Sequence, residues 1–244
     1  MRTSRLLAVC LAFAAAGRAH TAADLIRTLR SGVLTVAVTS VQSTGPYDSQ
    51  SWVRRYVERF AAESGLTIAW IVVPFDQSWL LASRGEVDLV ATNVASFPDR
   101  AHAGATVSAP FLVERRALRI RPADAGRFAR IDDFVGRKVG VVRGMAAERD
   151  VRRRAPAGVT IVPTDTFPQL YERFGAGDLD AIAEAEYFGL DGGVIPSHGP
   201  EVVLIDLHDL TPGQREESVF VVRDQSTNLL AEVNAFIART RIAP

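Results

Sequence analysis

Two spacings of apolar residues alternate along the first part of the chain. Three short apolar runs predict strands, at residues 34–38, 66–73 and 87–91. Residues 51–64 instead carry apolar or aromatic side chains near the helical period, Gly65 follows as a stop signal, and a shorter helix is predicted at 78–84. The resulting order of strand, helix, strand, helix, strand is typical of α/β layering.

The same alternation starts again near Phe128. Strands are predicted at residues 138–142, 159–162 and 179–183. Helices are predicted at residues 131–136, 145–154, 166–174 and 186–190. Two similar units on one chain imply two lobes.

Two further strand-like segments, 118–120 and 218–222, bracket the second unit, so the chain is expected to cross over and return. A C-terminal helix at 229–239 has an apolar stripe that would complete the first lobe. We therefore predict lobe 1 at residues 20–116 plus 216–244 and lobe 2 at residues 117–215. The carboxyl ends of both sheets would then face one cleft, where a ligand can be trapped by closure.

The first residues predict the compartment. A basic start, an apolar run at residues 6–16 and small residues at Gly17 and Ala19 are the features of a secretory signal peptide, which we place at residues 1–19. The run is shorter than the about 20 residues of a membrane span, so we expect release into the periplasm. Cys10, the only cysteine, would be removed, which leaves no thiolate nucleophile, disulfide or sulfur metal ligand.

Composition excludes several classes of function. With 48% hydrophobic residues, the chain has enough apolar material for two folded lobes. Its formal net charge of zero does not favour nucleic acid, and no phosphate-binding loop or dinucleotide fingerprint is present. The scattered histidines predict no metal site, and no cofactor is expected; they are His20, His102, His198 and His208.

One segment resembles a known family. Residues 88–101, Asp-Leu-Val-Ala-Thr-Asn-Val-Ala-Ser-Phe-Pro-Asp-Arg-Ala, are similar to the signature of the periplasmic polar amino-acid-binding proteins of ABC transporters, extracellular solute-binding protein family 3. Residues 107–111, 131–141 and 177–182 resemble later segments of that family in the same order. The resemblance implies a two-lobed type II periplasmic-binding-protein fold of the α/β class, with each lobe a sheet flanked by helices and two hinge crossovers.

The resemblance implies binding residues in the first lobe. Arg100 would grip the carboxylate of the solute, and its guanidinium offers a bidentate fork for that group. The alternative is an ordinary surface ion pair with Asp99. Asn93 and Ala95 belong to the same segment, although relatives usually have threonine where Ala95 stands. Tyr47 is a candidate for stacking on the solute, with a packing role in its shortened loop as the alternative.

The second lobe would contribute Arg143, Gly144 and Met145, where a strand ends and a helix begins, so that backbone N–H groups can meet an anion. A tight turn without a ligand is the alternative for Gly144, and Met145 replaces a usual hydroxyl residue. The aspartate that holds the amino group in relatives falls at Ala185, with Glu184 and Glu186 beside it. A keto acid or another carboxylate therefore stays open as the solute.

The predicted function is solute binding for uptake by an ABC transporter, with a small polar carboxylate, such as an amino acid or related organic acid, as the solute. We expect a monomer whose protein partner is an inner-membrane permease. A sensory ligand-binding module is one alternative. The other is a periplasmic cyclohexadienyl dehydratase-like enzyme, in which Glu184 or Glu186 would be the general acid. A solvated acidic helix start is the favoured explanation of these two residues, so we predict no enzyme activity and no catalytic residue.

Overall fold

A computed structural model describes residues 26–41, 51–100, 102–188, 190, 194–195, 203–206 and 216–240. Its strands are β1 (Val33–Val38), β2 (Thr67–Val72), β3 (Leu89–Ala95), β4 (Ala105–Val107), β5 (Leu112–Ile120), β6 (Lys138–Val142), β7 (Thr160–Thr164), β8 (Ala181–Phe188), β9 (Val194–Ile195), β10 (Val203–Asp206) and β11 (Glu216–Arg223). Its α-helices are α2 (Ser51–Glu63), α3 (Leu80–Ser83), α4 (Ala146–Arg154), α5 (Phe167–Gly175) and α6 (Leu229–Thr240). Short 3₁₀ helices are η1 (Pro98–Arg100), η2 (Pro122–Asp124) and η3 (Ile131–Phe134).

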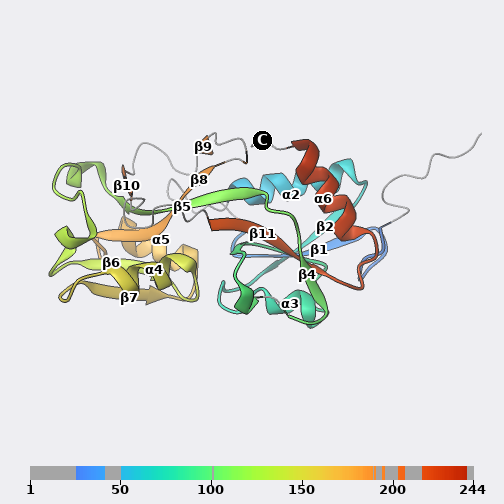
Figure 1. The fold of residues 1–244 in the computed structure, drawn as a ribbon, viewed down its shortest axis with the longest axis horizontal. Helices are drawn as coiled ribbons and strands as arrows, with labels where there is room; N and C mark the ends of the chain where they lie inside the picture. The colour runs from blue at the N-terminus through green and yellow to red at the C-terminus, as the bar shows by residue number, and fades with distance from the viewer. Residues whose placement is uncertain are drawn as a thin grey trace, which may run out of the picture.

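The strands form one hydrogen-bonded network that serves two lobes (Figure 1). The main order is β2-β1-β3-β11-β5-β8-β6-β7, while β4, β9 and β10 pair at the side. Lobe 1 contains β1 to β3 with α2, α3 and α6, and lobe 2 contains β6 to β8 with α4 and α5 (Figure 1). The predicted two-lobed α/β architecture is confirmed.

Lobe 1 is held by an aromatic core on one face of its sheet. The helical spacing in α2 places Trp52, Tyr56 and Phe60 on one stripe, and α6 supplies Phe236 to the same cluster. The Trp52 and Tyr56 rings stack with centroids 5.1 Å apart, and Phe111 stacks on the Trp52 ring at 5.8 Å. These stacks fix α2 against the segment that leads into β5.

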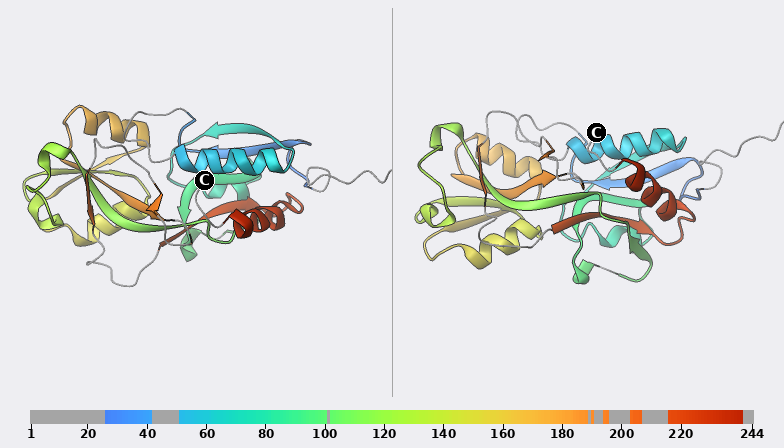
Figure 2. Two further views of the ribbon diagram at one scale, coloured as in Figure 1. Left: turned by 90° about the horizontal axis from the view of Figure 1, so that it is seen from above. Right: turned by 45° about the horizontal axis from the view of Figure 1, so that its top comes forward.

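Lobe 2 is a sheet between two helices, with α4 and α5 on opposite faces (Figure 2). Phe134 and Val151 pack on the α4 face, and Leu170 belongs to the α5 face. At Gly140, in β6, a Cβ atom would run into the side chains of Leu170 and Leu179. A glycine in this strand therefore lets α5 approach the sheet closely.

Two long strands join the lobes. β5 pairs with β11 at Leu112–Glu114 and with β8 along Val113–Arg119, and it crosses the molecule between the lobes (Figure 1). β11 then returns to pair with β3 in lobe 1. The predicted division at residues 116 and 117 falls inside β5, so the domain limits stay a prediction. The proposed signal peptide lies outside the described residues.

Several elements differ from the sequence-based expectation. The strand predicted at residues 118–120 begins already at Leu112. The strand predicted to end at residue 91 continues to Ala95, because β11 pairs with it as far as that residue. The helix predicted from residue 186 is wrong for residues 186–188, which belong to β8. The run Glu184, Ala185, Glu186, Tyr187 alternates acidic and apolar side chains at the strand period, and β5 pairs with all four residues.

A buried carboxylate ties together distant parts of lobe 1. Asp88 is fully buried just before β3. Its Oδ1 accepts hydrogen bonds from the Leu29 amide at 2.8 Å and the Ser226 hydroxyl at 2.7 Å. Its Oδ2 accepts from the Thr35 amide at 3.0 Å. One acid thus fixes the start of the described chain, β1 and the approach to α6.

Replacing Asp88→Asn should lower the free energy of unfolding by about 2 kcal/mol, because an amide nitrogen cannot accept a hydrogen bond from these buried donors. Urea unfolding followed by circular dichroism measures the change. Asp224→Asn is the matched control: Asp224 is exposed and accepts one side-chain hydrogen bond, from Thr106 Oγ1, among the described residues, so we expect a cost within about 0.5 kcal/mol. Equal costs for both variants would contradict the structural role of Asp88.

Candidate functional site

The two lobes meet at Arg100. This residue ends η1, a few residues after β3, and only 2% of it is exposed. Its Nη2 donates to the Gly144 carbonyl of lobe 2 at 2.8 Å, and its Nη1 donates to the Ala95 carbonyl of lobe 1 at 3.3 Å. One guanidinium therefore connects the end of β3 with the turn that precedes α4.

Aromatic rings surround this guanidinium. The Arg100 Cζ atom lies 4.7 Å from the Trp79 ring centroid, 4.9 Å from Phe97 and 5.3 Å from Phe75. Such rings attract a cation through their electron-rich faces. They also exclude water, and that burial, with a smaller contribution from the positive charge of Arg149, lowers the pKa of Arg100 to about 10. Arg100 therefore remains positively charged at neutral pH.

Arg100 makes no direct ion pair with a carboxylate within the described ranges, and its Nε has no hydrogen-bond partner there. The negative charges of Asp99 and Glu114 act on it from a greater distance and partly oppose the lowering of its pKa. Asp99, the acid next to it, instead pairs with Arg149 of lobe 2 at 2.8 Å on the exposed side of the junction. This second contact between the lobes lowers the pKa of Asp99, mainly through the hydrogen bond from Arg149.

The lobe 2 side of the junction is a tight turn at Gly144. Its φ of +79° is left-handed, and a Cβ atom there would lie 2.8 Å from Oδ1 of Asp76 in lobe 1. The Gly144 amide donates to Oε2 of Glu148 at 2.7 Å. The backbone N–H that the sequence analysis assigned to an anion is thus held by a carboxylate of the chain itself. Buried Met145 follows as the first residue before α4.

Three other predicted site residues lie close to this junction along the chain. Asn93 and Ala95 are buried in β3, and Asn93 has a left-handed φ of +56°. Arg143 precedes Gly144 and pairs with Asp165 at 3.1 Å in an exposed position. Tyr47 lies outside the described residues.

The two acidic candidates on β8 are paired with arginine residues away from Arg100. Glu184 is buried, pairs with buried Arg119, and accepts a hydrogen bond from the Tyr171 hydroxyl at 2.6 Å. Glu186 is half-buried and faces Arg115 at 3.5 Å. Ala185, between them, packs into the aromatic core of lobe 1. The structure therefore brings Gly144 to Arg100 but gives Glu184 and Glu186 arginine partners of their own.

Sequence reasoning missed several residues of the junction. Phe75, Asp76 and Trp79 lie in the segment between β2 and α3, and Phe97 and Glu148 lie beside predicted site residues. The two aromatic residues before α3 carry no spacing signal of their own, because a short helix cannot show a clear period. Phe97 immediately precedes the Pro-Asp-Arg run, and this position next to the predicted site was the signal that could have identified it.

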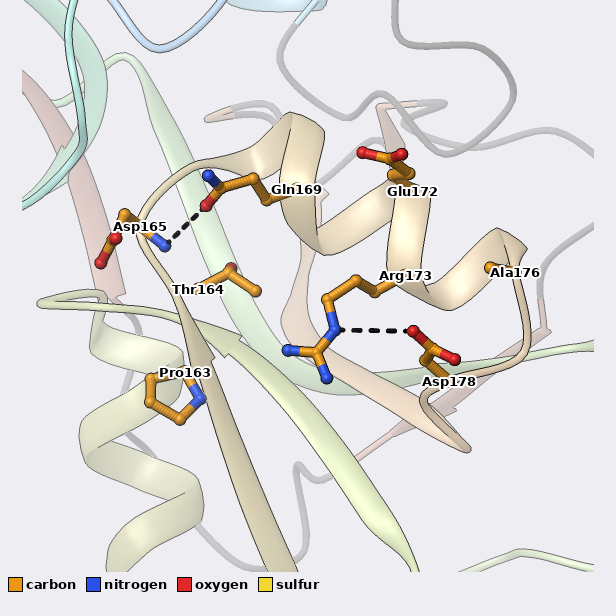
Figure 3. A pocket seen from close by; sticks show the side chains of 8 residues that line it. All are labelled: Pro163, Thr164, Asp165, Gln169, Glu172, Arg173, Ala176 and Asp178. Atoms are coloured by element: carbon orange, nitrogen blue, oxygen red, sulfur yellow. Dashed lines mark hydrogen bonds and ion pairs between the residues drawn. The ribbon is translucent and has the colours of Figure 1, made fainter.

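A groove on lobe 2 is lined by residues of β7, α5 and the turn after α5 (Figure 3). It has a volume of about 440 Å³ and runs along α5 from the end of β7. The Asp165 backbone amide donates to Gln169 Oε1 at 3.2 Å, and Arg173 Nε faces Asp178 Oδ2 at 3.9 Å (Figure 3).

Within the described ranges no helix is long and apolar enough to cross a membrane. The same part of the chain contains no group of three or more histidine, cysteine or acidic residues that could hold a metal ion. No protein-family profile matches the sequence. None of the curated proteins matches it either.

Solved structures with this architecture are abundant. An amino acid ABC transporter substrate-binding protein of Streptococcus pneumoniae, AbpA, bound to L-arginine, is 17% identical with a TM-score of 0.64, over 86% of this chain and 89% of that one. Arginine-bound truncated ArgBP from T. maritima is 17% identical with a TM-score of 0.63, over 85% and 96%. The chain has the type II periplasmic-binding-protein fold.

Another structure with the type II fold is a reconstructed ancestor. The ancestral amino-acid-binding protein AncCDT-1, a precursor of cyclohexadienyl dehydratase, is 17% identical with a TM-score of 0.64, over 86% of this chain and 90% of that one. At this identity the likeness shows the fold, and the solute has to be argued from the site.

Closure of this type II fold should depend on the glycine at residue 144. In Gly144→Ala, the methyl group would meet Asp76, so we expect the lobes to separate and the radius of gyration from small-angle X-ray scattering to rise. Gly177→Ala is the control, because Gly177 has φ +85° with open space around it. Both variants should lose about 1–2 kcal/mol of stability from backbone strain. An unchanged radius in Gly144→Ala would contradict the tight contact.

The buried pair on β5 and β8 should matter for stability. Glu184→Gln leaves the Arg119 charge uncompensated, so the free energy of unfolding should fall by about 3–5 kcal/mol in urea titrations. The double change Arg119→Met with Glu184→Leu should recover most of that loss. Glu186→Gln, in the half-exposed pair with Arg115, serves as the control and should cost about 0–1 kcal/mol. A similar small cost for Glu184→Gln would show that its charge is not needed.

Proposed function

We propose that the protein binds a small polar carboxylate between its lobes and delivers it to an ABC permease in the periplasmic face of the inner membrane. The observation that carries the proposal is the buried guanidinium of Arg100, which has two carbonyl acceptors but no carboxylate within the described residues. A buried cation without a counter-ion is costly, and an anionic solute offsets that cost. Residues 1–19 would direct export, and the protein would act as a monomer.

Binding would exchange one acceptor for another. When the lobes open, the Gly144 carbonyl leaves the Arg100 Nη2 atom, and the guanidinium faces the cleft with the Phe75, Trp79 and Phe97 rings behind it. A carboxylate can then accept two parallel hydrogen bonds from the planar group. Because the solute would contact both lobes only when they close, its affinity favours the closed form.

The same geometry favours binding over turnover. A general acid must lie within hydrogen-bond reach of the reacting group. Glu184 is held by Arg119 and Tyr171, and Glu186 faces Arg115, so both candidate acids already serve as partners of other residues. Dehydratase activity therefore has no supporting contact in the described site.

A thermal-shift screen tests the proposal. Amino acids, 2-oxo acids, aromatic acids and amines are each added to the wild type, Arg100→Met and Arg100→Lys. A carboxylate should raise the Tm of the wild type by mass action. Arg100→Met should weaken its affinity about 100-fold, and Arg100→Lys should weaken it less because the charge remains but the fork is lost.

Arg127→Met is the matched control, because Arg127 is an exposed arginine paired with Asp124 in lobe 2. It should bind the solute as the wild type does. A carboxylate that stabilises the wild type and Arg100→Met equally would exclude the proposed grip. Stabilisation by amines alone would exclude the proposed class of solute.

A further inference from the structure

A buried carboxylate, Glu114, lies on β5, the first strand that crosses between the lobes. Only 2% of Glu114 is exposed, and Arg116 on the same strand places its Nη2 atom 3.6 Å from Glu114 Oε2. Glu216 of β11 pairs with the same guanidinium, and the Ser218 hydroxyl of β11 donates to Glu114 Oε1. Two carboxylates therefore share one buried arginine where the two crossing strands meet.

Neighbouring strands add further titratable groups around Glu114. The strand β11 places Glu216 directly opposite Glu114, and β8 places Tyr187 directly opposite it on the other side. Glu184 of β8 adds a negative charge from farther away, and Arg100 adds a positive one. The shared arginine neutralises only one of the two carboxylates, so Arg100 supplies the balancing positive charge.

Backbone contacts fix the position of Arg100 relative to Glu114. Ser218, whose hydroxyl contacts Glu114, pairs with Ala95 at the end of β3. Arg100 donates to the carbonyl of that same Ala95 at 3.3 Å. The backbone amide that follows Ala95 donates to a carbonyl of β11 at 2.9 Å. The Arg100 turn and the Glu114 cluster are therefore attached to the same short stretch of β11.

The charges of Arg100 and Glu114 act on each other through the protein interior. Burial raises the pKa of Glu114, while the charge of Arg116, the hydrogen bond from Ser218 and the charge of Arg100 oppose that rise. In return, the charge of Glu114 opposes the lowering of the Arg100 pKa by burial. Water screens such interactions far more strongly than a protein interior does. The ionised form of Glu114 therefore depends in part on the positive charge of Arg100.

A solute carboxylate bound to Arg100 would neutralise that positive charge. The pKa of Glu114 would then rise further, because a nearby positive charge no longer favours the ionised form. The cluster can hold the neutral acid as well as the ionised one. The Ser218 hydroxyl can accept a hydrogen bond as readily as donate one, and Arg116 keeps Glu216 as its partner.

We infer that binding of an anionic solute at Arg100 is accompanied by uptake of one proton from solvent at the Glu114 carboxylate, so that affinity rises as the pH falls. Because Glu114 holds a proton more tightly in the bound form, affinity increases by up to about tenfold per pH unit between the Glu114 pKa values of the free and bound forms. This window lies above the usual range of a glutamate, because burial raises the pKa of Glu114. The inference rests on the proposed function and adds a proton to its binding step.

The coupling can be measured without a solute. Glutamate labelled with ¹³C at the carboxyl carbon reports the titration of each side chain by NMR, and Glu114→Gln identifies the signal of Glu114. Arg100→Met removes the charge that a bound carboxylate would neutralise, so Glu114 should titrate at a pH higher by at least about 0.5. Arg127→Met removes an exposed arginine of lobe 2 and should leave the titration unchanged. An unchanged titration of Glu114 in Arg100→Met would overturn the inference.

Isothermal titration calorimetry measures the proton uptake itself. The probes are L-glutamine, phenylpyruvate and benzoate, each titrated in buffers of different ionisation enthalpy between about pH 5.5 and pH 8. Wild-type binding should take up as much as about one proton, with a Kd that falls toward low pH. Glu114→Gln should bind without that uptake and with the same affinity at every pH. Glu217→Gln changes an exposed acid on β11 and should keep the wild-type uptake.

A second variant keeps the test decisive if Glu114→Gln does not fold. Ser218→Ala removes a hydrogen bond that lowers the pKa of Glu114, so the pH window of proton uptake should move upward. Uptake that persists in Glu114→Gln, or a window that stays in place in Ser218→Ala, contradicts the inference while the binding itself supports the proposed function. If no carboxylate of the thermal-shift screen binds, the proposed function and the inference both fail.

Discussion

A positive charge buried between two lobes is the constraint on which this molecule depends. Arg100 reaches from the end of β3 to the turn before α4, and aromatic rings keep water from it. Burying the Arg100 charge without a directly paired carboxylate destabilises the closed state. The Gly144 carbonyl and the faces of the aromatic rings offset part of that cost, so the lobes can still close. The junction is therefore closed by contacts that an anion could improve, which is the property a binding cleft needs.

Local patterns predicted most of the fold. The stripe of α2 and the short apolar strands are encoded within a few residues, so their bounds agree with the structure to within a few positions. The extension of β3 and the strand at residues 184–188 were missed because their partners, β11 and β5, are distant in sequence. In residues 184–186, glutamate alternates with alanine, which is only a weak local signal for a strand. Pairing with the distant strand β5 determines that this segment is a strand.

The site was only partly predictable for a related reason. The Pro-Asp-Arg run drew attention to Arg100, and the strand-to-helix turn drew attention to Gly144. That these two residues meet, that Asp99 pairs with Arg149, and that Glu148 holds the Gly144 amide depend on how the lobes sit together. The arginine partners of Glu184 and Glu186 also come from another strand, β5, which no local spacing reveals.

The position of β11 has a consequence for how the chain folds. This strand lies in the middle of the network, between β3 and β5, although it is synthesised after all the other described strands. Until residues 216–223 arrive, β3 has an unpaired edge, and lobe 1 lacks both a central strand and α6. Folding must therefore wait for contacts of very long sequence separation, which slows it and prolongs exposure of apolar strands to aggregation. Lobe 2, whose β6, β7 and β8 lie within one continuous stretch, can assemble first.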